Sequence, residues 1–260
     1  MAHVPLPPGP AAVSPTEPDA AVVVITGGGR GIGAATARRL AAPGRRLLLG
    51  YRGDAARAAA VAQDVAARGG AADIHPADVA DPDAVAGLFA AADRLGRLTG
   101  LVNNAGVTSP LAPLAATDPA DLRRVVEVNL LGALYCAREA ARRMAAGAAI
   151  VNVSSAAATL GSAGEYVHYA ATKGAVETLT VGLARELAPA GVRVNAVAPG
   201  VVRTDIHAVS GDPGRPDRLA SRIPLGRPGL PEEVAEAIAH LLSPAASYTT
   251  GAVLRVSGGL

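Results

Sequence analysis

Residues 21–33 read AVVVITGGGRGIG, and this stretch decides the fold class. Ala21–Thr26 is an uninterrupted β-rich apolar run, which is typical of a strand buried on both faces. Glycines follow directly, and helical apolar spacing runs over Ile32–Ala42. A tight turn of this kind needs positive φ angles, and residues without Cβ let a pyrophosphate approach the backbone. Because the first amides and the dipole of a helix bind phosphate, this order favours a nucleotide site over a simple glycine turn.

The same alternation of apolar strand and helix continues along the chain. The expected strands are Ala21–Thr26, Leu47–Tyr51, Ala72–His75, Gly100–Asn103, Ala149–Val153, Val192–Val197 and Ala252–Val256. The expected helices are Ile32–Ala42, Asp54–Arg68, Pro82–Leu95, Asp118–Ala146, Val167–Leu187 and Pro231–Leu242. Strands without polar alternation indicate a parallel sheet covered by helices on both faces. The pattern therefore predicts an α/β protein with one doubly wound domain and a parallel seven-stranded sheet.

Residues 1–19 are rich in Pro and have no hydrophobic period, so we expect a disordered tail before one domain over residues 20–260. The tail has no Arg or Lys, and Pro interrupts its apolar residues, unlike a secretory signal. No run of about 18 apolar residues occurs, so no transmembrane helix is expected. We therefore expect a cytoplasmic protein.

The composition argues against several classes of function. The net charge is only +2, with acidic residues spread among basic ones, so no nucleic-acid or membrane partner is expected. Aromatic residues make up 2%, too few for stacking single-stranded nucleic acid. The single cysteine, Cys136, excludes a disulfide framework and lies in an apolar run as a buried hydrophobe. The five His show no ligand spacing, so no metal is expected.

Lys173 is the single lysine among 24 basic residues. In a chain that uses Arg almost everywhere, it marks a place where an ammonium is needed, unless it survives by chance. Tyr169 lies four residues earlier, so a helix would place both side chains on one face. A phenol has a pKa near 10, and a neighbouring ammonium would lower it. The pair predicts an acid–base site; the alternative is an amphipathic pair on a surface helix.

Further motifs follow in a fixed order. They are Gly27 with Gly31-Ile32-Gly33, Asp78-Val79, Asn103-Asn104-Ala105-Gly106, Asn129, Ser155, Tyr169 with Lys173, and Pro199-Gly200. With these residues the chain resembles the short-chain dehydrogenase/reductase family over roughly residues 20–260. The resemblance implies a Rossmann fold, and it is close to 3-oxoacyl-carrier-protein reductases and to glucose-dehydrogenase-like members.

The resemblance implies a catalytic set of Asn129, Ser155, Tyr169 and Lys173. In this set Tyr169 exchanges a proton with the substrate oxygen, and Ser155 orients that oxygen. Lys173 contacts the nicotinamide ribose, and Asn129 holds a proton-relay water. The neighbouring Ser154 is the alternative to Ser155. Ser155 lies one residue further from the tyrosine than is usual in the family, and Ser154 lies one residue further still. We prefer Ser155 as the second member of the serine pair, with a one-residue insertion in the loop that follows.

The cofactor residues implied are Gly27, Arg30, Gly31, Ile32, Gly33, Tyr51, Arg52, Asp78, Val79, Asn104, Ala105, Gly106, Tyr169, Lys173, Pro199, Gly200, Val202 and Thr204. In this fold an acid at the end of the second strand binds the 2′-hydroxyl of NAD. Here Arg52 follows that strand, with no acid before Asp54, and Arg30 approaches from the glycine turn. Two guanidiniums would bind a 2′-phosphate, so NADPH/NADP+ is predicted, with NADH as the alternative. The other interpretation is that Arg52 is solvated and Arg30 only covers the turn.

Residues 205–222 contain Gly, Pro and offsetting charges with little periodicity, and we expect a mobile lid that sets specificity. Neither an acidic nor a basic small-molecule substrate is favoured. The expected activity is NADPH-dependent reduction of a ketone, with Tyr169 as general acid. The alternatives are an oxidative alcohol or sugar dehydrogenase and a non-catalytic NADP(H) sensor. On the helix Val167–Leu187 we expect Tyr169, Lys173 and Val176 to face the cofactor, and the other surface to carry the small residues Ala170, Ala171, Gly174 and Thr178. Small residues permit close helix approach, and the family resemblance implies that this helix and the long one before it pair between copies, so a homotetramer is predicted.

Overall fold

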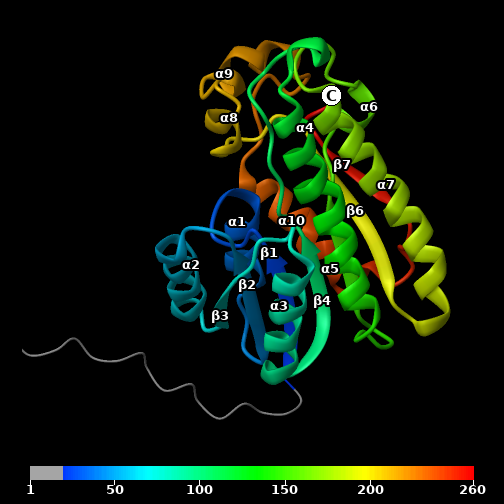
Figure 1. Ribbon diagram of the computed structural model, residues 1–260. Helices are drawn as coiled ribbons and strands as arrows, with labels where there is room; N and C mark the ends of the chain where they lie inside the picture. Colours follow the sequence, from blue (N-terminus) through cyan, green and yellow to red (C-terminus); the bar gives the residue numbers. More distant parts are fainter. Residues whose placement is uncertain (1–19) are drawn as a thin grey trace, which may run out of the picture.

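Seven short segments form one parallel sheet in the computed structural model of the protein, which describes residues 20–260 (Figure 1). The strands are β1 Ala21–Thr26, β2 Arg45–Tyr51, β3 Ala71–Pro76, β4 Arg97–Asn103, β5 Ala149–Val153, β6 Arg193–Pro199 and β7 Val253–Val256. Their order across the sheet is β3-β2-β1-β4-β5-β6-β7. Strands β2 and β3 lie on one side of β1, whereas β4 to β7 follow on its other side. The strand order therefore reverses between β1 and β4, and a crevice opens there at the carboxyl ends of the strands. The predicted α/β Rossmann fold is confirmed; the predicted tail, residues 1–19, lies outside the described residues.

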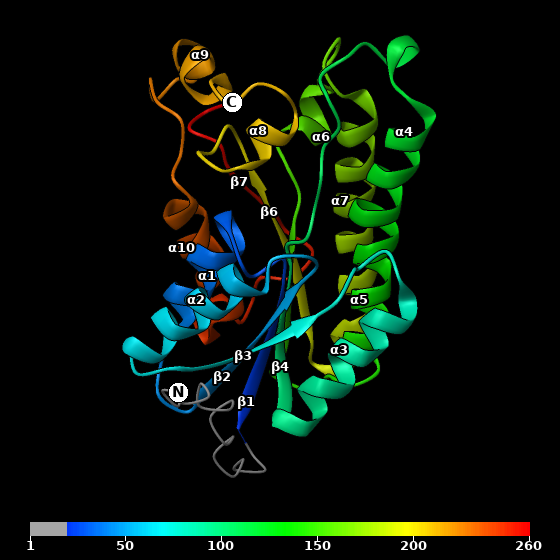
Figure 2. The same ribbon diagram turned by 60° about the vertical axis from the view of Figure 1, so that its left-hand side comes forward.

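Helices cover both faces of the sheet (Figure 2). One face carries α1 (Gly31–Leu40), α2 (Ala55–Ala67) and α10 (Pro231–Leu242). The other carries α3 (Pro82–Leu95), α4 (Pro119–Val126), α5 (Gly132–Ala141) and α7 (Val167–Leu187). Each face buries its own apolar cluster, so the sheet is the middle layer of three. None of the helices within residues 20–260 has the length and apolar content of a membrane span.

The cluster beneath α3, α5 and α7 contains Phe89 and Cys136, both fully buried. Burial raises the pKa of the Cys136 thiol to about 12, and the nearby Glu139 carboxylate adds to the effect. A thiol that stays protonated is a poor nucleophile, so the interpretation of Cys136 as a buried hydrophobe is confirmed.

The predicted helix Asp118–Ala146 is divided and shorter. It forms α4, then a π turn at Glu127–Leu131, then α5, which ends at Ala141. α5 begins at Gly132, which lies against the loop that follows β3. A Cβ added to Gly132 would lie 2.7 Å from Val79 Cγ2. The prediction was wrong here because local helical spacing does not reveal a π turn, which is typically tied to a functional site.

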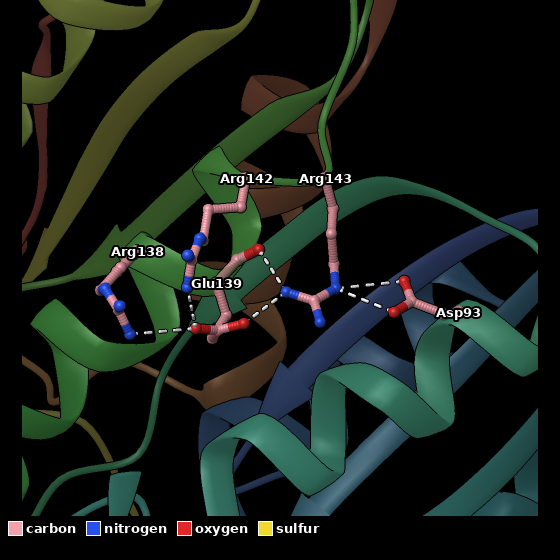
Figure 3. A network of polar contacts seen from close by, with 5 residues as sticks. All are labelled: Asp93, Arg138, Glu139, Arg142 and Arg143. Atoms are coloured by element: carbon pink, nitrogen blue, oxygen red, sulfur yellow. Dashed lines mark hydrogen bonds and ion pairs between the residues drawn. The ribbon is translucent and has the colours of Figure 1, made fainter. Parts of the chain in front are cut away.

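A buried carboxylate on α5, Glu139, is the centre of a polar network that connects α5 to α3 (Figure 3). Glu139 contacts three guanidiniums, with Arg138 Nη1 at 3.3 Å, Arg142 Nη1 at 3.5 Å and Arg143 in a closer contact. Arg143 Nε also reaches Asp93 Oδ2 on α3 at 3.0 Å. The network ties the two helices together at their polar edge.

Candidate active site

A cavity of about 650 Å³ opens at the carboxyl ends of the strands and gathers most of the predicted site residues. It is lined by every predicted catalytic and cofactor residue except Gly33 and Asn129. These residues are far apart in the sequence, but they lie close together because the carboxyl ends of the parallel strands meet at one edge of the sheet.

The glycine turn between β1 and α1 has the backbone that a pyrophosphate needs. Gly27 and Gly31 have φ angles of +65° and +51°, in the region that L side chains avoid. Gly33 does not line the cavity, but an added Cβ there would lie 2.3 Å from the Gly27 carbonyl oxygen. Gly33 therefore lets α1 begin directly behind the turn. These residues fit a dinucleotide, because the turn they allow brings the first amides of α1 to the cavity, where they can bind its phosphates.

Thr26 and Asn104 fix the glycine turn to the end of β4. The Thr26 Oγ1 accepts hydrogen bonds from the backbone N–H groups of Asn104 and Ala105, each at 3.0 Å. The Asn104 Nδ2 donates to the Thr26 carbonyl at 2.8 Å and to the Gly27 carbonyl at 3.2 Å. The two motifs thus form one rigid unit at the point where the strand order reverses.

Asp78 lines the cavity beyond β3 and is held by two donors. Its carboxylate accepts hydrogen bonds from the Ala80 N–H at 3.1 Å and from Arg124 Nη2 at 3.0 Å. Partial burial raises the pKa of Asp78, but these hydrogen bonds and the guanidinium charges outweigh it and lower the pKa overall. Arg124, on α4, also lines the cavity and was missed, because it is 46 residues from its partner.

Three guanidiniums border the cavity beside the glycine turn: the predicted Arg30 and Arg52, and also Arg57. Within residues 20–260, Arg30 and Arg52 are exposed and make no ion pair. Arg57 pairs with Asp54 at 3.3 Å and with Asp205 at 2.7 Å. Asp54 caps α2 by accepting from the Arg57 N–H at 2.9 Å, so the first acid after β2 is committed to the helix.

Tyr169 and Lys173 lie on one face of α7 and are both buried. Burial raises the pKa of Tyr169 to about 12, against the opposing effect of a hydrogen bond with Ser155. Burial also lowers the pKa of Lys173 to about 8. The Lys173 Nζ donates to the Val153 carbonyl at 2.8 Å and lies 5.7 Å from the centre of the Tyr169 ring. Desolvation of the phenolate thus dominates the pKa of Tyr169 in this structure, and the lowering by the Lys173 ammonium stays a prediction.

The two candidate serines differ in their partners. Ser154 is buried and donates to the Glu177 Oε1 at 2.9 Å and to the Lys173 carbonyl at 3.2 Å. Ser155 accepts from the Ala157 N–H at 3.1 Å, at the start of α6 (Ala157–Leu160), and its side chain acts to lower the pKa of Tyr169. The geometry therefore favours Ser155 as the partner of the tyrosine, while Ser154 anchors α7.

Asn129 lies in the π turn and does not reach the cavity. Its Oδ1 accepts from the Val107 N–H at 2.8 Å, and its Nδ2 donates to the Val107 carbonyl at 2.9 Å and to Thr172 Oγ1 at 3.3 Å. The Thr172 Oγ1 in turn donates to the Tyr169 carbonyl at 2.7 Å. Asn129 thus connects the loop after β4 with α7; its role toward a water stays a prediction.

Comparisons with known proteins decide the family. The profile described as enoyl-(acyl carrier protein) reductase matches residues 27–260. The chain belongs to the short-chain dehydrogenase/reductase family. Cis-4-hydroxycyclohexanecarboxylate dehydrogenase of Sinomonas cyclohexanicum is 46% identical over 243 residues, covering 92% of this chain and 95% of the relative. The 3-oxoacyl-[acyl-carrier-protein] reductase of Synechocystis sp. is 38% identical over 246 residues, covering 93% and 97%. A short-chain dehydrogenase from Burkholderia cenocepacia J2315, solved in complex with NADP, superposes with a TM-score of 0.86 at 35% identity, covering 93% and 98%.

As a short-chain dehydrogenase/reductase, the protein is an oxidoreductase that acts on alcohol or carbonyl groups, and the resemblance found in the sequence is confirmed. The fold of this family binds NAD(P). Among residues 20–260, no group of three or more His, Cys, Asp or Glu is placed to hold a metal ion.

The segment 205–222 contains two short helices, although its sequence shows little periodicity. It forms α8 (Ile206–Val209) and α9 (Arg215–Leu219), of 4 and 5 residues, which are too short for their period to be recognised. Ion pairs hold it to itself and to the body of the protein: Arg203 with Asp217, Arg218 with Asp212, and Arg215 with Glu165. Its mobility stays a prediction.

Tyr166 is a second tyrosine that lines the cavity. Its ring packs edge-to-face on Tyr169, with centres 5.2 Å apart at 78°. Arg215 from α9 covers its other side, with the guanidinium carbon 5.1 Å from the ring centre. The segment 205–222 thus forms one wall of the cavity around Tyr169.

Proposed function

We propose that the protein is an NADP(H)-dependent reductase that converts a ketone to an alcohol, with Tyr169 as proton donor. The observation that carries the proposal is the position of Tyr169: its buried side chain lines the cavity together with Ser155, and Lys173 lies on the same face of α7. A protonated, desolvated phenol is a suitable acid for a carbonyl oxygen that gains negative charge.

Each catalytic side chain has a separate task in this proposal. Ser155 already accepts a hydrogen bond from the Ala157 N–H, so its own hydroxyl hydrogen is available to donate to the substrate oxygen. Tyr169 transfers its proton to that oxygen. Lys173, with its lowered pKa of about 8, exchanges protons near neutral pH and stabilises the phenolate that is left. When bound, the nicotinamide cofactor supplies the hydride.

We assign NADP(H) as the preferred cofactor from the charges around the glycine turn. Arg30 and Arg52 line the cavity without an ionic partner in the described chain, and Asp54 is held as a helix cap. Guanidiniums form strong charge-assisted bonds with a 2′-phosphate. NADH is the alternative cofactor. Because oxidation is the reverse of the same steps, an alcohol or sugar dehydrogenase is the second candidate function.

The experiment is a panel of ketones and alcohols assayed with NADPH/NADP+ and with NADH/NAD+ through nicotinamide absorbance. The proposal expects ketone reduction, faster with NADPH. Oxidation of alcohols without ketone reduction would favour the dehydrogenase. Tight NADPH binding without turnover of any compound would instead favour a sensor.

A further inference from the structure

Arg215 is a buried cation that the reaction steps above do not use. It is 6% exposed, on α9 at the wall of the cavity. Its Nη2 contacts the Glu165 carboxylate, whereas its Nε is buried without a hydrogen-bond partner. A buried guanidinium with an unused donor is costly, and a second acceptor in the cavity would relieve that cost.

Arg215 is set apart from the other charged residues within 20–260 that line the cavity. Arg30 and Arg52 border the glycine turn, Asp54 caps α2, Arg57 is paired with Asp205, Arg124 is paired with Asp78, and Lys173 donates to the Val153 carbonyl. Arg215 lies against the Tyr166 ring, with its guanidinium carbon 5.1 Å from the ring centre, and it also lines the cavity. The Thr108 Oγ1, which also belongs to a lining residue, is buried without a partner too.

We propose that Arg215 binds a carboxylate of the substrate, so that the reacting ketone or alcohol belongs to an oxo acid or a hydroxy acid. This rests on the proposed function, because it assigns a substrate class to the chamber around Tyr169. A guanidinium has five N–H donors in a planar fork, and Glu165 engages one of its nitrogens. A second carboxylate can use the guanidinium nitrogens that Glu165 leaves free.

The competing explanation is that Arg215 only fastens the lid. In that case its ion pair with Glu165, which precedes α7, holds α9 over Tyr166. Loss of such a contact would slow every substrate alike, whereas loss of a carboxylate site slows acids more than their esters. The ratio of kcat/KM for an acid to that for its methyl ester therefore separates the two explanations.

The test uses matched pairs of acid and methyl ester: 4-oxopentanoate, 5-oxohexanoate and 4-oxocyclohexanecarboxylate, each reduced with NADPH. We expect the wild type to prefer the acid by about tenfold or more in at least one pair. Arg215→Met should lower that ratio by about 10- to 100-fold, the scale of a lost hydrogen bond to a charged group. Arg215→Lys keeps the charge and should restore part of the ratio.

Two further variants keep the result interpretable. Arg218→Met removes the same charge from the same helix, where the side chain is exposed and paired with Asp212, and should leave the ratio unchanged. Glu165→Gln removes the competing carboxylate and should leave the preference for acids equal or greater. If Arg215 only holds α9 in place through Glu165, the rates for acids and esters should instead fall in parallel.

The outcomes separate the two levels of inference. Equal or better reduction of the esters by the wild type, or a parallel loss of both in Arg215→Met, overturns the carboxylate site while the reductase function stands. Reduction of neither member of any pair overturns the proposed reductase function and the carboxylate site with it.

Discussion

In the proposed mechanism, Tyr169 is the proton donor, so its hydroxyl is the first group to test. Tyr169→Phe removes only the hydroxyl, and the ring can keep its edge-to-face contact with Tyr166. Turnover should fall on the order of 100-fold or more, the usual scale for losing a general acid, while NADPH binding stays nearly the same. Initial rates and cofactor titrations measure both effects. Tyr248→Phe, at a fully exposed tyrosine, is the control; near-normal rates in Tyr169→Phe would remove the tyrosine from the mechanism.

Lys173 can be titrated directly, because it is the single lysine of the chain. Protein grown with ¹³C-labelled lysine gives one side-chain signal, whose shift should titrate with a midpoint near the pKa of about 8. Burial disfavours the ammonium, so the pKa moves down from its ordinary 10.5. A midpoint near 10.5 would mean that the ammonium is better solvated or better paired than its contacts indicate.

Arg52 tests the choice of cofactor. Arg52→Asp replaces a cation at the cavity with a carboxylate, which repels a 2′-phosphate and can accept from a 2′-hydroxyl. The ratio of kcat/KM for NADPH to that for NADH should fall by about tenfold or more. Arg68→Asp, at the exposed end of α2, makes the same charge change outside the cavity and should leave the ratio alone. A wild type that prefers NADH, or an unmoved ratio in Arg52→Asp, would show that these arginines do not recognise the phosphate.

At the scale of the elements, the Glu139 network shows how polar contacts fasten helices at the edge of the core. Glu139→Gln should lower the free energy of unfolding by about 1–3 kcal/mol, because it removes a buried charged acceptor shared by three guanidiniums. Glu236→Gln is the matched control, since its exposed pair with Arg39 should contribute less than about 1 kcal/mol. Urea unfolding of both variants measures the difference, and equal losses would contradict the network's role.

The same network has a defined pH dependence. Partial burial raises the pKa of Glu139, but the hydrogen bond and the charge of Arg143 and its neighbours outweigh it and lower the pKa below 4.5. The carboxylate's contribution is therefore present above pH 4.5 and is lost as the pH falls through the lowered value. The gap in stability between wild type and Glu139→Gln should close on acidification.

The elements also show what sequence can and cannot predict. Apolar runs and glycine turns are local, so the strands, the main helices and the motifs at their ends were predicted close to their observed bounds. The residues that were missed act across long separations: Arg57 meets Asp205 at 148 residues, and Arg215 meets Glu165 at 50. Their sequence neighbours carry no sign of these contacts. The π turn at Asn129 was missed because its sequence continues the helical spacing on both sides.

At the scale of the whole molecule, the outer surface of α4, α5 and α7 suits self-association. Ala171 and Thr178 are exposed as expected for a close helix contact, and Val126, Leu134 and Val181 are exposed by 36–39% on the same three helices. Two details of the expectation were wrong: Ala170 is buried against Tyr166 and Tyr169, and Val176 is buried without lining the cavity. The remaining small and apolar residues still offer a surface where helices of two copies can approach closely.

We therefore expect a homotetramer, and light scattering at micromolar concentration should give about four times the mass of one chain. Val181→Asp and Leu134→Asp place charges on this surface and should shift the protein to smaller species, because a carboxylate in an apolar interface loses its hydration. Both positions are exposed in the single chain, so the folded fraction by circular dichroism should not change. Deletion of residues 1–18 should alter neither the number of chains in the assembly nor the activity if the tail is inert. A monomer mass for the wild type would mean that these small residues serve only packing within one chain.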